Sequence, residues 1–557
     1  MNFYRSEVVK EQNNAPAYTA NVSGTLQDTN MAFAKAGNTT LNSQIIVGAN
    51  IINAYSSFEG CSGLNSPITF NAASKSYDYS RMFASCSRLN QNINIAGGSR
   101  NISNMFAGCT NLNGYVNAQN IVNAENAFRG CSMLNGNVRI SGTNKINNMF
   151  NGCLSLNHDV ILSGASSFPT ASLFYAHPRL NRNILINNAD NCYQMFYGCS
   201  NLKRNIMIGG STSKNCYQMF YGCTNLDNEI TVTGITNAEN MFEECTGLKR
   251  VSISSASYDT NYQYAFLNCR SFNQNLSIYG RNANYIFAGC SSLNQPLSVD
   301  AYYLDHAFDG CSNLNAMPTF ADNIWGANYL FANCSNFNQP INMDCTGNGM
   351  FYNCTNLDKP VSIALGSFFQ GNSLFENCHK LNSPVTFTSI PTQANANNTF
   401  RNCHSFNQNI DMGLFTGGME NTFRDCYSLN QNINISGGGD TYNAALFEKY
   451  RNTFRNCTNL DQNILLHRTN NADNTFTDCP NMTNFSVNYW KNNKLLMGNK
   501  NKSRWLNVYI LTRFIDYHNL WKMFGNSSIT FTSQTLVGSE YTRRYYNDDW
   551  KINVFSV

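Results

Sequence analysis

The chain has 557 residues, of which 13% are charged and 42% are hydrophobic, and its formal net charge at pH 7 is +4. This composition allows a large folded core and excludes a chain that is disordered by composition. Nucleic-acid binding would need a basic stripe beside stacking aromatics, whereas 37 Lys and Arg stand against 33 Asp and Glu without a long basic run. We therefore expect no nucleic-acid partner.

Residues 1–50 carry a weakened version of the pattern that follows them. The stretch MAFAKAGNTTLNSQIIV keeps a Phe and a Leu-Asn pair but lacks a Cys. The first coil of a stacked repeat faces water on one side, so we expect residues 1–50 to be an N-terminal cap or attachment segment. The opening residues show no apolar signal-peptide region, and no run of 18 apolar residues occurs, so we expect no membrane insertion.

A repeated frame occupies residues 51–487. It consists of a Phe, a Cys three residues later, a large apolar residue, usually Leu, three further on, and apolar residues ten and twelve after the Phe. Successive copies are spaced by about 23 residues, which indicates a solenoid in which each repeat is one coil. The nineteen copies begin at Phe58, Phe83, Phe106, Phe128, Phe150, Phe174, Phe196, Phe220, Phe242, Phe266, Phe287, Phe308, Phe331, Phe351, Phe375, Phe400, Phe423, Phe454 and Phe476.

Each position of the frame predicts a structural role. Apolar pairs two residues apart, such as Ile93 and Ile95, indicate a short strand with one buried face. The residue two after the Phe is Gly in eight copies and Asn or Asp in eight more, which predicts a left-handed bend there. Asn or Asp follows the apolar residue in sixteen copies, and we expect these side chains to bond the backbone of the neighbouring coil.

The cysteines indicate a buried column and not a set of disulfides. The chain has 21 of them, an odd number, and eighteen recur once per coil, with His177 at the one exception. Neighbours in such a column point the same way, so they are poorly placed for a disulfide, and we expect small buried apolar side chains. Cys192, Cys216 and Cys345 lie outside the frame, and the first two are expected to stack on each other.

We expect neither a metal nor a cofactor. The sequence has seven His, with no C-x-x-C, H-x-H or H-E-x-x-H motif. The nearest constellation is Cys378-His379 with Cys403-His404 on adjacent coils. Its thiols are expected to point inward and its imidazoles outward, which argues against shared ligation.

The frame resembles the BspA-type leucine-rich repeats of bacterial and protist surfaces. The stretches RMFASCSRLNQNINI, NMFNGCLSLNHDVIL and GMFYNCTNLDKPVSI look like a variant with a Met-Phe-x-x-Cys core. The resemblance covers roughly residues 50–487 and implies a leucine-rich-repeat-like solenoid with a parallel β-sheet along one side, used mainly for adhesion and protein contact. The repeat departs from the family because it lacks the usual proline after the strand. A right-handed parallel β-helix is the alternative fold.

Residues 488–557 drop the frame and are rich in Trp and Tyr. Such a segment suits either a C-terminal cap of the solenoid or a docking module, since aromatic side chains are frequent at interfaces. Both interpretations stay open.

Adhesion-type repeats without an export signal favour a bacteriophage structural protein. The leading hypothesis is a non-enzymatic tail or fibre adhesin of the virion, oligomeric in the particle. It would contact other virion proteins through a terminal segment and a host-surface protein or glycan through the solenoid. The second hypothesis is a cellular leucine-rich-repeat surface antigen or protein-binding scaffold, at the cell surface or in the cytoplasm. The third is a β-helix polysaccharide depolymerase, which would need paired carboxylates that do not recur at the outward strand positions.

The candidate ligand-binding residues come from a duplicated motif, NCYQMFYGC, at residues 191–199 and 215–223. Its tyrosines are Tyr193, Tyr197, Tyr217 and Tyr221. Packing of some of these rings in the core is the preferred interpretation, and a small aromatic patch on the surface that binds a ligand is the alternative.

Overall fold

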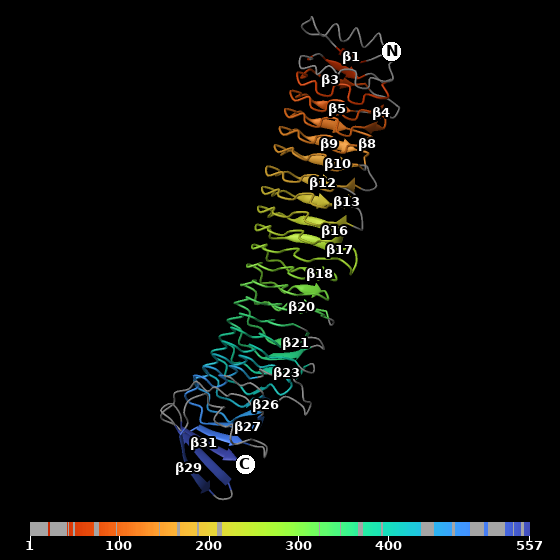
Figure 1. The fold of residues 1–557 in the computed structure, drawn as a ribbon. Helices are drawn as coiled ribbons and strands as arrows, with labels where there is room; N and C mark the ends of the chain where they lie inside the picture. The colour runs from red at the N-terminus through yellow and green to blue at the C-terminus, as the bar shows by residue number, and fades with distance from the viewer. Residues whose placement is uncertain are drawn as a thin grey trace. The chain divides into compact units, whose positions relative to one another are not determined.

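The computed structural model is a solenoid of parallel coils, each of which places its strand beside the strand of the next coil (Figure 1). The described residues form thirty-one strands and no helix. The structure describes residues 51–490, except 72–76, 96, 144, 164–167, 187–188, 209–213, 322–323, 346, 366–370, 391–393, 436–449 and 470–473, together with residues 42 and 44 and the strands at 20–22, 45–47, 506–510, 530–537, 540–546 and 551–556.

The chain forms two compact units, residues 1–274 with 278–282 and residues 275–277 with 283–557. In the first unit a parallel sheet runs along one side of the coils, and its partners are in register from Ile93 to Val251. Its strands are β5 (Ile93–Ile95), β7 (Val116–Ala118), β9 (Val138–Ser141), β10 (Val160–Ser163), β12 (Ile184–Ile186), β14 (Ile206–Ile208), β16 (Ile230–Asn237) and β17 (Val251–Ser255). Before them, β1 (Ala20–Val22), β2 (Ile45–Val47) and β3 (Ile68–Phe70) form a parallel set of their own.

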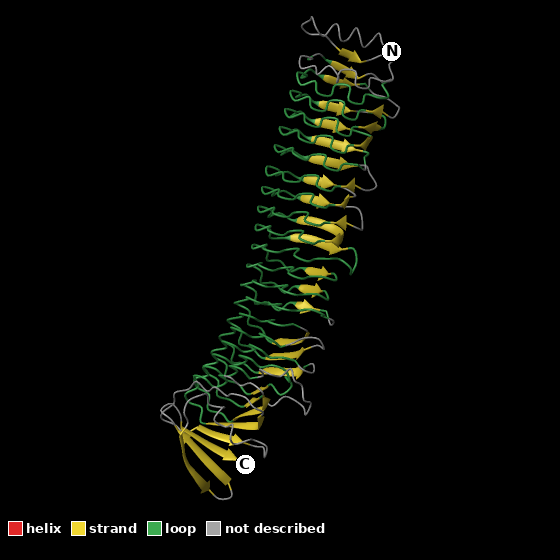
Figure 2. Cartoon of the chain, viewed as in Figure 1, coloured by secondary structure: helices red, strands yellow, loops and turns green. Residues whose placement is uncertain are grey.

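A second, narrower run of strands follows the first sheet around the coil and was not predicted. It comprises β4 (Tyr77–Asp78), β6 (Arg100–Asn101), β8 (Ile121–Asn123), β11 (Phe168–Pro169), β13 (Ala189–Asn191) and β15 (Lys214–Asn215). The long strand β16 belongs to both runs, because Ile206 pairs with its residue Ile230 and Lys214 pairs with its residue Ile235. The remaining part of each coil is a series of turns (Figure 2).

The second unit repeats this parallel stacking and ends differently. The strand pairs from β19 to β28, and the pair of β28 with β31, are parallel. At the end of the unit β30 pairs antiparallel with both β29 and β31. The strands are β19 (Ser298–Asp300), β20 (Thr319–Phe320), β21 (Ile341–Cys345), β22 (Val361–Leu365), β23 (Val385–Ser389), β24 (Ile410–Asp411), β25 (Ile433–Asn434), β26 (Ile464–Thr469), β27 (Asn484–Trp490), β28 (Leu506–Ile510), β29 (Thr530–Val537), β30 (Glu540–Tyr546) and β31 (Lys551–Ser556), and β18 (Ser277–Tyr279) has residues in both units.

The predicted fold class is therefore confirmed: the chain is a repeat solenoid with a parallel sheet along one side. Much of the predicted terminal segments, 1–50 and 488–557, lies outside the described residues. Their described parts are the strands β1 and β2, residues 42 and 44, the last three residues of β27 and the strands from β28 to β31. Their roles as cap, attachment segment or docking module stay predictions.

The nineteen frame phenylalanines form the centre of the core, and all are 0% exposed. Within each unit their rings stack face to face from coil to coil, with centroid separations of 5.1–5.8 Å. Burying one such ring contributes about 1.5–3 kcal/mol. Strands on the other side alternate as predicted, with Ile93 and Ile95 buried and Asn94 exposed.

The frame cysteine has a specific hydrogen-bonding role beside its packing role. Cys131 Sγ donates to the carbonyl oxygen of Phe106 in the preceding coil at 3.0 Å, and sixteen such bonds of 2.8–3.1 Å occur. All twenty cysteines whose side chains are described are buried free thiols, so the predicted column of small buried side chains is confirmed for its members among them. Cys192 and Cys216 are both buried and directly follow the paired residues Asn191 and Asn215 of neighbouring coils, so they stack as predicted.

The left-handed bend two residues after the Phe occurs in all nineteen copies, with φ between +54° and +79°. Gly, Asn and Asp fill sixteen of them, and the others are Ser85, Ala176 and Glu244. A second left-handed residue, two before the Phe, also occurs in every copy and was not predicted. Asn occupies it in eight copies, but side chains as different as Arg81, Gln194 and Tyr264 occupy it in others, so its residue type is a weaker signal than that of the first bend.

The predicted ladder of Asn and Asp side chains is confirmed. The Oδ1 atom of the residue after the frame Leu accepts a hydrogen bond from the backbone N–H at the same position of the next coil. Fourteen such bonds measure 2.8–3.0 Å. Each satisfies a backbone donor that no strand pairs.

Substitutions at the bend after the Phe test its backbone conformation. At Gly222 an added Cβ would meet no atom within 4 Å, so Gly222→Ala changes little besides the backbone preference at φ +69°. We expect it to destabilise the fold by about 1 kcal/mol, and Ala176→Gly to stabilise it by about 0.5 kcal/mol. Chemical denaturation of the two variants checks both signs, and a neutral or stabilising Gly222→Ala would contradict the account.

The thiol column predicts a loss of stability at alkaline pH. Burial raises the pKa of fifteen column thiols, that of Cys61 to about 12. Unfolded thiols ionise near pH 8.5, so above it the unfolded chain binds fewer protons than the folded chain, and unfolding becomes easier. The stabilisation by buried protonated thiols is complete below about pH 8.5. Above this pH the free energy of unfolding falls by about 1.4 kcal/mol for each thiol and each pH unit.

The measurement is the melting temperature from pH 7 to pH 10 in the presence of a phosphine reductant, followed by circular dichroism. We expect a steep fall above the ordinary thiol pKa, and a shallower fall when Cys109, Cys131 and Cys153 are replaced together by Ala. A melting temperature independent of pH over this range would contradict the prediction.

Candidate functional site

The four predicted tyrosines lie on the surface in two columns. Tyr193 and Tyr217, each three residues before a frame Phe, stack with ring centroids 5.3 Å apart and planes 11° apart. Tyr197 and Tyr221, each one residue after a frame Phe, stack at 4.8 Å, and Tyr175 extends this column at 4.9 Å from Tyr197. We call these five residues, together with the two glutamines and the three carboxylates described next, the tyrosine face.

Two glutamines lie between the columns, at the left-handed position before the Phe. Gln194 donates from Nε2 to Oε1 of Gln218 at 2.8 Å. The two left-handed residues of each coil keep the tyrosines outside while the Met and Phe between them point into the core. Tyr193 is 37% exposed, and Tyr197, Tyr217 and Tyr221 are half-buried. None of the four rings is buried, so the preferred interpretation of core packing was wrong and the rings lie on the surface. Their role in ligand binding stays a prediction.

The next coil continues the tyrosine face with carboxylates, which sequence reasoning missed. Glu239 holds the frame position of Tyr217, Glu243 holds that of Tyr221, and Glu244 follows it. Amides hold these carboxylates in place: Asn261 Nδ2 donates to Glu239 at 3.1 Å, Asn268 Nδ2 donates to Glu244 at 2.8 Å, and Asn240 donates to Glu243. The sequence did contain a signal for Glu239 and Glu243, since they occupy the frame positions that hold tyrosines in the two preceding coils.

The carboxylates change the electrostatics of the tyrosines. Burial, followed by the charges of Glu239 and Glu243, raises the pKa of Tyr217. Burial and then Glu243 raise the pKa of Tyr221 in the same way. Burial also raises the pKa of Glu243 itself, with a smaller contribution from Glu244 against the opposing hydrogen bond of Asn240. At neutral pH the tyrosine face therefore presents phenol hydroxyls beside negative charge.

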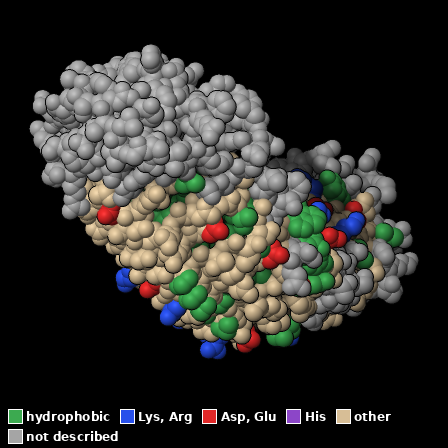
Figure 3. All heavy atoms as spheres, turned by 90° about the horizontal axis from the view of Figure 1, so that it is seen from below, with side chains coloured by type: hydrophobic (Ala, Val, Ile, Leu, Met, Phe, Trp, Pro, Cys, Tyr) green, Lys and Arg blue, Asp and Glu red, His purple; other side chains and the backbone are tan. Residues whose placement is uncertain are grey.

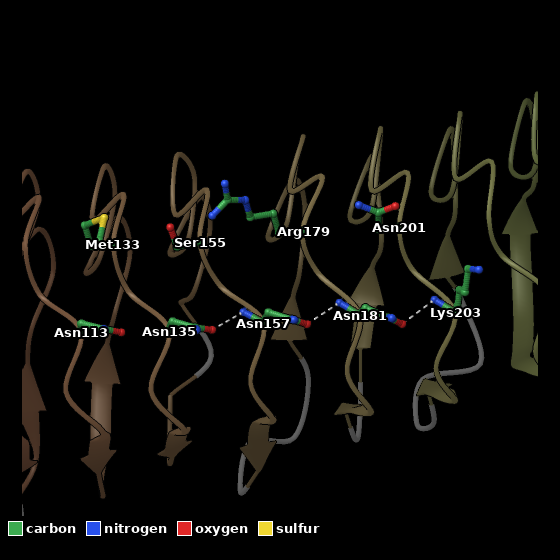
Figure 4. Close-up of a pocket in the computed structure, with 9 residues that line it drawn as sticks. All are labelled: Asn113, Met133, Asn135, Ser155, Asn157, Arg179, Asn181, Asn201 and Lys203. Atoms are coloured by element: carbon green, nitrogen blue, oxygen red, sulfur yellow. Dashed lines mark hydrogen bonds between the residues drawn. The ribbon is translucent and has the colours of Figure 1, made fainter.

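A groove of 640 Å³ crosses the coils of the first unit at a different place, after the frame cysteine (Figure 4). One edge is the ladder of Asn135, Asn157 and Asn181, whose Oδ1 atoms accept backbone N–H groups at 2.8, 2.9 and 3.0 Å. Arg179 extends over the groove from the other edge, and Lys203 stands at the end of the ladder. We call it the amide groove. Sequence reasoning missed it because its residues meet only when the coils stack.

Charges on the described surface are otherwise sparse. On the face seen in Figure 3, Lys, Arg, Asp and Glu side chains lie scattered among uncharged polar ones. Among the residues that line the amide groove, two are cationic and none is acidic. The tyrosine face and the amide groove therefore differ in the sign of their charge.

The two Cys-His pairs on adjacent coils have the expected geometry, with thiols inside and imidazoles outside. His379 and His404 stack on the outside with ring centroids 4.6 Å apart, while Cys378 and Cys403 are buried. Burial and the neighbouring His379 lower the pKa of His404. Within the described part of the chain no group of three or more His, Cys, Asp or Glu side chains is arranged to hold a metal ion. The same part contains no helix of the length and apolarity that a membrane span requires.

The stacked parallel coils define the chain as a repeat-solenoid protein. The profile of DUF285, described as a Mycoplasma protein of unknown function, matches most of it, and the chain belongs to this family. The confirmed relationship is to the repeat family as a whole, and the Met-Phe-x-x-Cys variant stays a prediction. The matched segments are residues 24–115, 100–209, 169–279, 214–320, 259–347, 302–413 and 415–493.

Other comparisons add little. No curated protein matches the chain. A solved structure titled "Crystal structure of TLR13-ssRNA13 complex" is similar over 80% of this chain, with 13% identity and a TM-score of 0.24. The chain spans 53% of the length of that protein.

Proposed function

We propose that the chain is a non-enzymatic binding scaffold and that its tyrosine face contacts a protein segment bearing Lys or Arg side chains. The observation that carries this proposal is the continuity of the two tyrosine columns with Glu239, Glu243 and Glu244 on adjacent coils. From Phe174 to Phe266, no Lys or Arg occupies the positions from three before to two after each frame Phe.

The arrangement suits long cationic side chains for a physical reason. Stacking covers most ring faces, so the columns present ring edges and phenol hydroxyls. A Lys or Arg stem packs along such edges while its charged end pairs with a carboxylate beyond them. Tyrosine also loses little conformational entropy on binding, which is why it is frequent in contact surfaces. The amide hydrogen bonds that hold the three carboxylates lower the entropy lost on binding further.

The repeat architecture supports a binding role more generally. Each coil presents the same positions to solvent, so neighbouring contacts add along the stack and weak contacts give avidity. Membership of a repeat family described from Mycoplasma proteins supports the cellular alternative, a surface or protein-binding repeat protein. The narrower hypothesis of a phage tail or fibre adhesin in a virion, with its oligomeric state and virion partners, stays a prediction that neither the described residues nor the comparisons address.

Binding of defined peptides tests the proposal. The probes are a panel of twelve-residue peptides rich in Lys and Arg and a matched panel in which Glu replaces those residues. We expect the intact chain to prefer the cationic panel. The double variants Tyr197→Ala with Tyr221→Ala and Glu239→Gln with Glu243→Gln should each weaken that binding at least about tenfold, because both remove central contacts.

The matched control is Tyr115→Ala, an exposed tyrosine of the same unit that lies outside the tyrosine face. It should leave peptide affinity unchanged, and circular dichroism checks that each variant is folded. Equal affinity for both panels, or equal affinity in all variants, would exclude the proposed role of the tyrosine face.

The depolymerase interpretation makes a separate prediction. A polysaccharide incubated with the chain would become shorter, which size-exclusion chromatography detects. We expect its size distribution to stay unchanged.

A further inference from the structure

We infer that the amide groove is a second binding site, independent of the tyrosine face, and that its ligand is an extended anionic polysaccharide. The site lies on the coils from Phe106 to Phe196, within one compact unit. It is long in the direction of the solenoid and open to solvent, which suits a polymer better than a small molecule.

The ladder supplies a row of neutral donors. Because each Oδ1 accepts a backbone N–H of the next coil, the amide planes of Asn135, Asn157 and Asn181 are fixed. Their Nδ2 groups have no hydrogen-bond acceptor among the described residues, and all three side chains are half-buried. One N–H₂ donor is thus presented per coil, about 4.8 Å apart. Hydroxyl and ring oxygens of successive sugar units are acceptors that such a row can bind.

Two cations give the groove its charge preference. Arg179 and Lys203 are exposed, and Figure 4 shows the Arg179 side chain extended toward the coil of Ser155. Arg182 and Arg204, also exposed, follow on the same coils, and Arg182 donates from Nε to the carbonyl of Asn157 at 2.8 Å. An Arg fork binds carboxylate or sulfate groups with two parallel hydrogen bonds. A polymer that combines hydroxyls with such anions matches both parts of the groove.

One apolar side chain completes the match. Met133 lines the groove and is 50% exposed, so it offers a surface for the C–H face of a sugar ring. An acidic peptide would use the cations, and its backbone carbonyls are also acceptors. On one edge of an extended peptide these carbonyls recur about every 6.8 Å, which does not match one donor about every 4.8 Å. The observations therefore favour a polysaccharide over a peptide.

Titration with three polymers tests the inference: alginate as a polyuronate, dextran as a neutral polysaccharide, and poly-glutamate as an acidic peptide. We expect alginate to bind best and its affinity to fall at high ionic strength, because the charged contacts are exposed. The variant Arg179→Gln with Lys203→Gln should weaken alginate binding at least about tenfold.

A second variant separates the donors from the fold. Asp occupies the ladder position at Asp358 and accepts the N–H of Asn382 at 2.9 Å, so Asp preserves the ladder bond. Asn157→Asp with Asn181→Asp therefore removes two N–H₂ donors and adds repulsion, and should also abolish alginate binding while the melting temperature stays close to that of the parent. Arg139→Gln, an exposed cation on β9 outside the groove, is the control that should bind normally.

The outcomes are decisive in both directions. Selective alginate binding that both groove variants lose supports the inference. Poly-glutamate bound as tightly as alginate, no binding of alginate by the intact chain, or full binding by the groove variants would overturn it. Cationic peptide binding should be unchanged in the groove variants, so failure of this inference is distinguishable from failure of the proposed function.

Discussion

The structure depends on one constraint: each coil must pair its backbone polar groups with the neighbouring coils, in the turns as well as in the strands. A buried backbone N–H or C=O without a partner is costly, and no helix is present in the described residues to satisfy these groups internally. The turns around each frame Phe solve this by alternation. Phe106 and Gly108 donate to carbonyls of the next coil at 2.8 and 2.7 Å, while Ala107 and Cys109 donate within their own coil at 3.1 and 3.0 Å.

The side chains of the frame follow from that alternation. Backbone N–H groups that bond to the next coil alternate with N–H groups that bond within their own coil. This alternation needs a left-handed residue at two positions of each coil, two before and two after the Phe. The Phe carbonyl accepts the backbone N–H of the Cys in its own coil, as Phe106 does from Cys109 at 3.0 Å, and also faces the next coil. A small side chain with a donor fits on that side, which is the frame Cys of the next coil. His177 fills the same place less well, since its Nε2 is buried without a partner among the described residues.

The backbone N–H of the residue three before the frame Phe finds its acceptor in different places in the two units. In eight coils of the first unit the residue three before the Phe donates to an Asn or Asp side chain of its own coil, as Ser103 does to Asn101 at 3.1 Å. In six coils of the second unit it donates to a side chain of the preceding coil, as Asn328 does to Asp305 at 2.7 Å. The first solution leaves the side chain at that position free to vary, and the tyrosine face uses this freedom at Tyr193 and Tyr217.

Sequence reasoning recovers the parts of this fold that residue type encodes. Phe, Cys, the Asn ladder, the strand alternation and the first left-handed bend are each marked by a recurring residue, so they were predicted. The second bend carries Asn in eight copies but residues such as Arg81 and Gln194 in others, so its signal is weak and was missed. The second run of strands is short and irregular and has no residue-type signal. The tyrosine patch was visible as a duplicated motif. Its extension through Glu239 and the amide groove around Arg179 depend on adjacency between coils, which only the stacked structure reveals.

Backbone hydrogen exchange tests the central constraint most directly, because it compares turn amides with strand amides in one molecule. If the turns are paired between coils, the amides of Phe106 and Gly108 will exchange as slowly as that of Val116 in β7, to within about tenfold. If they exchange at the rate of ordinary surface loops, on the order of a thousandfold faster than Val116, the turns are not held by their neighbours and the account is wrong.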